Sequence, residues 1–132
     1  YLFNTVQAGL ELLTEVDSPN IKLHLDTFHL NIEEEDIGVA IQAAGPQLRY
    51  FHAAENNRRR PGVGHIPWDT VAGALREISY EGWIVMEAFV RHEGEVGRTL
   101  SIWNPLVDDL ETEASEGAAF LRQKMGKKES VA

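Results

Sequence analysis

Three apolar runs of the chain each carry an ionisable residue at or near their end. Asp26 ends the run IKLHLD, His52 lies late in LRYFHAAE, and Glu87 ends WIVME. If each run is a parallel β-strand, the three side chains meet at the carboxyl edge of one sheet, where α/β folds place their chemistry. Two carboxylates and one imidazole suit Mn²⁺, Mg²⁺ or Co²⁺ and accept Fe²⁺ or Zn²⁺. The pattern therefore predicts a divalent metal site formed by Asp26, His52 and Glu87.

Two further polar residues follow these strand ends closely, His29 after Asp26 and Arg58 after His52. A metal that chelates adjacent carbonyl and hydroxyl oxygens acidifies the C–H bond between them and stabilises the enediolate that forms when the proton leaves. Glu87 could serve as both ligand and proton acceptor, while His29 and Arg58 hold oxygens of the substrate. The residues thus predict proton abstraction beside a carbonyl, the chemistry of sugar isomerases and epimerases.

Taken singly, these residues also have structural explanations. An Asp, His or Glu at a strand end often caps a helix or pairs with an opposite charge. Residues 58–60, three consecutive arginines, are typical of a solvated loop in which only Arg58 is a functional candidate. We expect His24 to be a buried, hydrogen-bonded residue. The acids of residues 33–36 are expected to lie in a first helical turn, where the helix dipole favours negative charge. The metal hypothesis therefore depends on three residues sharing one face.

Composition limits the class of protein. The chain has 132 residues, 43% of them hydrophobic and 25% charged, which is typical of one soluble globular domain. Because cysteine is absent, a metal must bind through oxygen and nitrogen. The net charge of −9 argues against binding to nucleic acids or anionic membranes. We expect a cytoplasmic location, since no apolar stretch is long enough to span a membrane and no signal segment is recognisable.

The remaining pattern alternates helices with strands. Apolar spacing predicts a first helix up to Val16, and a capping box of Asn31 and Glu34 predicts that the second helix begins there. Pro67 is expected to open a third helix, and a last helix is expected over residues 105–125. Between these helices the sequence predicts strands at residues 21–26, 48–54 and 83–89, and residues 91–98 are expected to be mobile. The domain is expected to cover residues 1–125, followed by a flexible tail at residues 126–132.

The predicted order αβαβαβα implies a parallel sheet with crossover helices. Side chains alternate between the two faces of a strand, so Asp26, His52 and Glu87 can all point away from the helix-covered face. Polar residues on that inner face suit the interior of a barrel near its mouth. Three strands cannot close a barrel, however, and their two unpaired edges predict self-association.

Three ordered segments, LHLDTFHLNIEEED, FHAAENNRRRPGVGHIPW and GWIVMEAF, resemble the xylose-isomerase-like TIM barrel superfamily. Within it they are most similar to the D-tagatose 3-epimerase and D-psicose (allulose) 3-epimerase group. The resemblance runs from residue 1 to about residue 122 and corresponds to the C-terminal portion of the barrel. It implies a partial (β/α)₈ barrel with three parallel strands and flanking helices.

The resemblance also implies roles for individual residues. Asp26, His52 and Glu87 would be metal ligands, Glu87 would be one of two catalytic acid/bases, and His29 and Arg58 would contact the substrate. Family members of this kind bind Mn²⁺ or a similar divalent ion such as Mg²⁺ or Co²⁺. They interconvert ketoses at C3 and commonly form homo-oligomers. A small ketose is therefore the expected substrate.

The chain departs from the family pattern in one respect. The family has a further metal-binding glutamate that acts as the opposite acid/base, and another substrate-binding glutamate, both of which would lie upstream of Tyr1. Because two-base epimerisation needs both groups, we expect the isolated chain to be inactive or weak. Alternative activities are those of a hydroxypyruvate isomerase or an inosose dehydratase, whereas the acidic charge disfavours an endonuclease-IV-like enzyme. A non-catalytic truncated barrel that acts as an assembly module is the other alternative.

Overall fold

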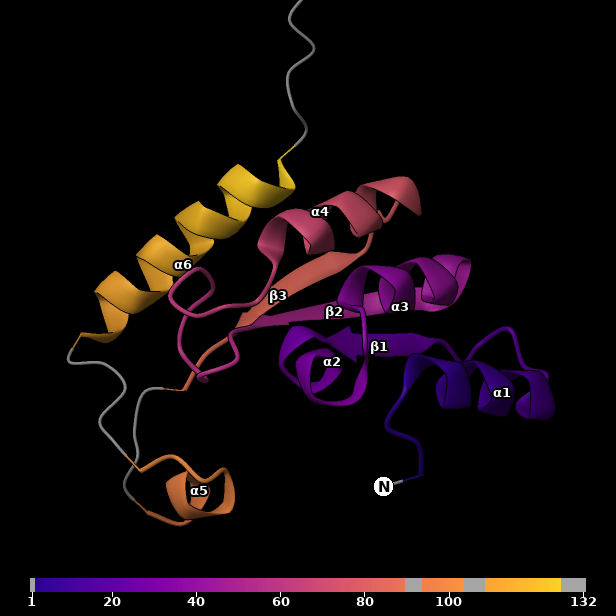
Figure 1. Ribbon diagram of the computed structural model, residues 1–132, viewed down its shortest axis with the longest axis horizontal. Helices are drawn as coiled ribbons and strands as arrows, with labels where there is room; N and C mark the ends of the chain where they lie inside the picture. The colour runs from indigo at the N-terminus through magenta and orange to yellow at the C-terminus, as the bar shows by residue number, and fades with distance from the viewer. Residues whose placement is uncertain (1, 90–93, 104–108, 127–132) are drawn as a thin grey trace, which may run out of the picture.

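The computed structural model describes residues 2–89, 94–103 and 109–126 (Figure 1). Three strands, β1 (Leu23–Asp26), β2 (Leu48–Ala54) and β3 (Trp83–Glu87), form a parallel sheet in the order β1-β2-β3. The other elements are α1 (Val6–Val16), α2 (Thr27–Glu33), α3 (Ile37–Ala44), the short 3₁₀ helix η1 (Gly45–Gln47), α4 (Trp68–Glu77), α5 (Gly94–Thr99) and α6 (Leu110–Met125). The predicted partial α/β architecture with three parallel strands is confirmed.

Helices cover one face of this sheet. Leu25 of β1 and Phe51 of β2 belong to the buried core, to which α1, α3, α4 and α6 also contribute. Their apolar side chains are removed from water, which is the main source of stability for such a layer. On the opposite face, Tyr50 is 38% exposed and Trp83 is 76% exposed. The chemistry-bearing face of the strands therefore remains open in the described part of the chain.

The strand register places the three candidate residues at one end of the sheet. Asp26 lies beside His52 in the β1–β2 pairing, and Glu87 lies beside Ala54, two residues beyond His52, in the β2–β3 pairing. Both pairings are parallel, so the carboxyl ends of all three strands meet at this edge. The alternation predicted from the sequence holds, and β1 and β3 are simply shorter than predicted.

The helix start predicted at Asn31 is wrong. Asn31 lies inside α2, which begins directly after β1 with Asp26 as its N-cap. A second helix, α3, begins at Ile37, with Asp36 as N-cap accepting a hydrogen bond from the Val39 N–H at 3.0 Å. The acids of residues 33–36 therefore do not occupy a first helical turn. Glu34 instead accepts a hydrogen bond from the Val6 N–H at 2.7 Å, a long-range contact that no local pattern shows.

Several other boundaries differ from the prediction. Residues 94–99 form α5, within a stretch expected to be mobile, whereas residues 90–93 lie outside the described residues. The last helix begins after Asp109, and residues 104–108, where its start was predicted, also lie outside the description. The same holds for residues 127–132 of the predicted tail. Within the described ranges, no helix combines the length and apolar character needed to cross a membrane.

Candidate metal centre

Asp26 is held in place by the start of α2. Its Oδ1 atom accepts hydrogen bonds from the N–H groups of Phe28 at 2.7 Å and His29 at 3.3 Å. These are donors that the first turn of a helix otherwise leaves unpaired, so the cap fixes the orientation of the carboxylate. The other oxygen, Oδ2, lies 3.6 Å from His52 Nδ1. The local structure thus directs one oxygen of Asp26 to the helix and the other to the site.

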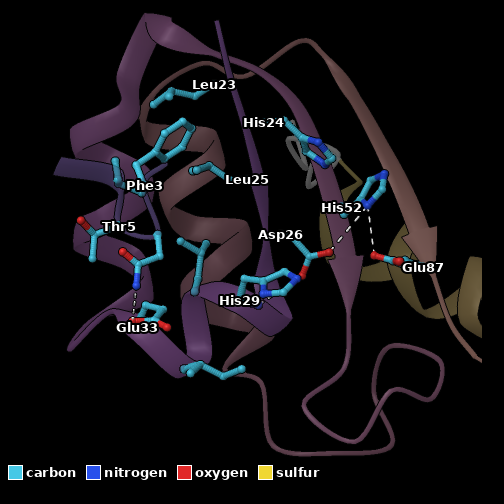
Figure 2. A pocket seen from close by; sticks show the side chains of 14 residues that line it. Phe3, Thr5, Leu23, His24, Leu25, Asp26, His29, Glu33, His52 and Glu87 are labelled. Carbon is cyan, nitrogen blue, oxygen red and sulfur yellow. Dashed lines mark hydrogen bonds and ion pairs between the residues drawn. The ribbon is translucent and has the colours of Figure 1, made fainter. Parts of the chain in front are cut away.

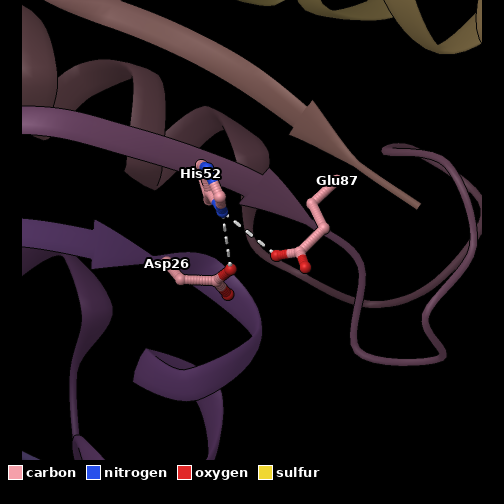
Figure 3. Close-up of side chains that lie close together, drawn as sticks. All are labelled: Asp26, His52 and Glu87. Carbon is pink, nitrogen blue, oxygen red and sulfur yellow. Dashed lines mark hydrogen bonds and ion pairs between the residues drawn. The ribbon is translucent and has the colours of Figure 1, made fainter. Parts of the chain in front are cut away.

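Asp26, His52 and Glu87 converge at the strand tips, as the sequence analysis predicted (Figure 3). His52 Nδ1 lies 3.1 Å from Glu87 Oε2, and one ligand atom from each residue lies within 4.8 Å of the others. Among the described residues this is the only group of three or more such side chains that could hold a metal ion. Two carboxylate oxygens and one imidazole nitrogen form a donor set that fits a divalent ion.

The two carboxylates experience different environments. Burial raises the pKa of Asp26 above its ordinary value, and the hydrogen bond with Glu87 acts in the same direction. Burial also opposes ionisation of Glu87, but hydrogen bonds with Asp26 and His52 and the charges of His52 and Arg58 hold the pKa of Glu87 below its ordinary value. The Asp26 carboxyl is therefore harder to ionise than an ordinary one and the Glu87 carboxyl easier, and Glu87 is the most exposed of the three side chains at 33%.

The cluster opens into a pocket of about 530 Å³ (Figure 2). His29 lines this pocket beside the three converging residues, and its side chain is accessible. His24 lines it as well, with its ring centroid 4.2 Å from that of His52. His24 is exposed rather than buried as predicted, because the inner face of the sheet is uncovered. Burial of part of its ring nevertheless lowers the pKa of His24, and the charge of His52 lowers it further.

Arg58 lies beside the cluster on the loop that follows β2. The carbon at the centre of its guanidinium group is 3.4 Å from the ring centroid of Phe28 and 5.2 Å from that of Phe89. Burial lowers the pKa of Arg58, whereas the negative charges of Asp26 and Glu87 raise it. The guanidinium is therefore within electrostatic reach of the two carboxylates, and the two aromatic rings give it a partly apolar setting that strengthens the attraction.

Two buried residues near the site carry no signal that the sequence analysis used. Thr27 is fully buried, and its Oγ1 donates a hydrogen bond to the Ala54 carbonyl at 2.6 Å and accepts one from the Ala54 N–H at 2.8 Å. This pair joins the start of α2 to the end of β2. Glu55 follows Ala54 and is also fully buried. An acid directly after a buried strand, followed by a glycine-containing loop, is the weak signal by which Glu55 could have been found.

Comparisons with known proteins identify the family and the fold of the chain. A family model described as "Xylose isomerase-like TIM barrel" matches residues 1–124. A D-psicose 3-epimerase of Ruminiclostridium cellulolyticum is 44% identical in a 127-residue alignment that covers 92% of this chain and 43% of that protein. A D-psicose 3-epimerase of Agrobacterium fabrum is 40% identical in a 131-residue alignment that covers 96% of this chain and 45% of that protein.

A solved structure shows the same arrangement of elements. A crystal structure of a D-psicose 3-epimerase in the presence of D-fructose matches with a TM-score of 0.90 and 40% identity, over 96% of this chain and 46% of that one. The chain thus spans less than half the length of the curated relatives described above. With a family model that covers nearly all of its sequence, the chain belongs to the xylose isomerase-like TIM barrel family.

Proposed function

We propose that this chain provides the metal-binding part of a ketose 3-epimerase. The observation that carries the proposal is the convergence of Asp26, His52 and Glu87 within 4.8 Å at the carboxyl ends of three parallel strands. Its support is that this cluster occurs in a chain 44% identical to a D-psicose 3-epimerase. The site, rather than the fold, carries the argument, because one barrel fold serves many reactions.

The three residues would hold one divalent ion, with Mn²⁺ as the proposed ion and Mg²⁺ or Co²⁺ as alternatives. Asp26 offers Oδ2, since its Oδ1 caps α2, and His52 offers Nδ1, which already faces both carboxylates. When bound, the ion would polarise the neighbouring carbonyl and hydroxyl oxygens of a ketose and acidify the C–H bond at C3. The helix cap fixes one ligand before binding, which reduces the entropy lost when the site is filled.

Glu87 is the proposed proton acceptor. Its Oε2 atom faces His52, so its Oε1 atom is available to take the C3 proton of a ketose in the pocket. The same hydrogen bonds and charges that hold its pKa below the ordinary value keep it ionised, and an acceptor must be ionised before it takes a proton. His29 and Arg58 are proposed to bind substrate oxygens, because His29 lines the pocket and the Arg58 guanidinium lies beside the carboxylates.

Epimerisation also requires a group that returns the proton from the opposite face. Glu87 already acts on one face, and the other carboxylate of the cluster, Asp26, has one oxygen on the helix cap and the other assigned to the metal. We therefore propose that the second acid/base comes from another segment or chain. On this proposal, the 132-residue chain binds metal but converts ketoses slowly or not at all.

Calorimetry with Mn²⁺ tests the site directly. In Asp26→Asn the amide oxygen can still cap α2, whereas the charge at Oδ2 is lost, so the fold is retained and the site is weakened. We expect the Kd for Mn²⁺ to rise at least about tenfold, which corresponds to about 1.4 kcal/mol. Glu33→Gln is the matched control, because Glu33 lines the same pocket but is not part of the cluster.

Equal Mn²⁺ affinity of the wild type and Asp26→Asn would refute the metal site. An equal loss in Glu33→Gln would show that only the overall charge of the pocket matters. Turnover of D-fructose or D-tagatose is measured in parallel, with Glu87→Gln as the inactive variant. Metal-dependent turnover by the 132-residue chain, lost in Glu87→Gln, would support the proposed chemistry but contradict the proposed need for a second chain or segment.

A further inference from the structure

The loop between β2 and α4, residues 55–67, is organised around one buried side chain. Glu55 is 0% exposed, although it is a carboxylate in a loop. Burying a carboxylate is costly unless its oxygens are hydrogen-bonded, so its partners indicate what it stabilises. Glu55 is not part of the metal cluster, and the proposed reaction assigns it no role.

Both oxygens of Glu55 accept hydrogen bonds from distant parts of the loop. Oε1 accepts from the Ile66 N–H at 2.9 Å and from the Asn56 N–H at 3.4 Å. Oε2 accepts from the Gly62 N–H at 2.8 Å and from Trp68 Nε1 at 2.9 Å. A carboxylate is the side chain that can accept at two oxygens in this way, and bonds to a charged group are stronger than neutral ones. Glu55 therefore links the beginning, middle and end of the loop to the first residue of α4.

The same residue closes the turn that carries Arg58. The Arg58 N–H donates to the Glu55 carbonyl at 3.0 Å, and Arg58 itself has a φ of 65°, in the left-handed region. A non-glycine residue pays an energetic cost for this conformation and keeps it only when its surroundings impose it. In this conformation the Arg58 guanidinium stacks on Phe28, which belongs to α2, the helix that Asp26 caps.

A second buried carboxylate holds the outer side of the loop. Glu113 of α6 is 6% exposed and accepts hydrogen bonds from the N–H and Nε of Arg60 at 3.1 and 3.2 Å. Residues 58–60 are therefore not a solvated loop as predicted, because Arg60 is held by α6. The loop lies between two buried carboxylates, and Glu55 is the one that contacts the turn of Arg58.

We propose that Glu55 is a positioning residue that holds Arg58 in its left-handed turn, with the guanidinium against Phe28 and facing the metal cluster. The role of Arg58 in binding a ketose rests on the proposed function, whereas its placement by Glu55 does not. The competing explanation is that Glu55 only contributes to overall stability. If Glu55 positions Arg58, a substitution that destabilises the chain elsewhere leaves the Arg58 side chain in place. If Glu55 only adds stability, such a substitution displaces Arg58 as much as a change of Glu55 does.

Nuclear magnetic resonance of the Arg58 side chain distinguishes the two explanations and requires neither metal nor substrate. A guanidinium centred 3.4 Å from an aromatic ring has its Nε–H signal displaced by the ring current of Phe28. In Glu55→Gln one oxygen becomes an NH₂ group that faces two donors, whichever way the amide is turned. We expect the loop to detach, the Arg58 signal to move to the position of an unstacked arginine, and tryptic cleavage after Arg58 to accelerate at least tenfold.

Phe51→Leu is the control for stability, because Phe51 is fully buried in the sheet and outside the loop. It is compared at a temperature where it and Glu55→Gln are equally folded. An Arg58 signal that is unchanged in Glu55→Gln, or that moves equally in Phe51→Leu, would overturn the proposal.

A second variant decides the question if Glu55→Gln does not fold. Trp68→Phe removes one donor to Oε2 and keeps the carboxylate, so a smaller displacement of the Arg58 signal in the same direction is expected. No displacement in this variant would overturn the proposal. Because none of these measurements uses metal or turnover, a failed Mn²⁺ titration would count against the proposed function and leave this result standing.

Discussion

At the scale of single residues, Asp26 shows that a structural and a functional explanation can apply to different atoms of one side chain. Its Oδ1 caps α2, and its Oδ2 faces His52. The cap restricts the rotamer, and the restricted rotamer directs the free oxygen towards the cluster. An aspartate that ends a strand and begins a helix thus needs no additional residue to orient it.

Thr27 provides a test of how the strand ends are held together. In Thr27→Val the side chain keeps its shape but loses the hydroxyl, so both the N–H and the carbonyl of Ala54 lose their buried partner. Each buried group left unpaired costs about 1–3 kcal/mol. We expect the free energy of unfolding, measured by urea denaturation, to fall by at least about 1 kcal/mol.

Thr27→Ser is the matched control, because it retains the hydroxyl and removes only a methyl group. It should keep most of the stability that Thr27→Val loses. If Thr27→Ser destabilises the chain and Thr27→Val does not, the methyl group of Thr27 holds the end of β2, and the two hydrogen bonds to Ala54 do not.

The sequence predicted the convergence of the cluster but not the residues around it. Asp26, His52 and Glu87 were accessible to prediction because strand alternation and parallel pairing fix where a strand-end side chain points. Glu55 carried only a weak signal, because its partners are backbone and indole N–H groups, most of them brought to it by the folded loop. No spacing rule connects a carboxylate to donors of that kind.

At the scale of elements, strands and long helices were predictable, and short helices were not. Three apolar runs with alternation identified β1, β2 and β3. In contrast, α5 has only 6 residues, two of them glycines, so it has no apolar period to detect. Three residues of types that favour N-caps occur close together, namely Asp26, Asn31 and Asp36, and local sequence does not select among them. Tertiary contacts decide which of them begins a helix, since Glu34, the partner of Asn31 in the predicted capping box, accepts a hydrogen bond from the Val6 N–H of α1.

The corrected start of α3 can be tested by two substitutions. Asp36→Ala removes the oxygen that accepts from the Val39 N–H and should lower the free energy of unfolding by about 1 kcal/mol. Asp36→Asn should restore most of this loss, because asparagine caps about as well as aspartate. Asn31→Ala should change stability by less than about 0.5 kcal/mol, since Asn31 lies within α2 and caps nothing. A larger loss in Asn31→Ala than in Asp36→Ala, measured by thermal or urea denaturation, would favour the capping box over the observed boundary.

At the scale of the whole molecule, the sheet has an uncovered face. Parallel sheets are normally covered on both faces, and barrels of this family enclose the inner one. In this chain the described residues leave Tyr50 and Trp83, neighbours across β2 and β3, exposed on that face. Among the described strands, β1 and β3 also each have one edge without a strand partner. Both features favour contact with another polypeptide.

We therefore expect the chain to self-associate through this face. Trp83 is its most exposed large apolar side chain at 76%, and burying an indole removes a large apolar area from water. Light scattering coupled to size-exclusion chromatography should show a mass that rises with protein concentration. Association should also strengthen with added salt, because a net charge of −9 makes the chains repel one another at low ionic strength.

Trp83→Lys identifies the surface involved. The lysine makes the net charge less negative and so weakens repulsion, which means that a loss of association can come only from the lost apolar surface and the blunted strand edge. We expect the dissociation constant to rise at least about tenfold, or about 1.4 kcal/mol. Trp103→Lys is the matched control, because Trp103 is 72% exposed but lies outside the sheet. An equal loss of association in both variants would assign the effect to general hydrophobicity. A wild-type chain that stays monomeric at every concentration and salt level would show that the open face does not drive assembly.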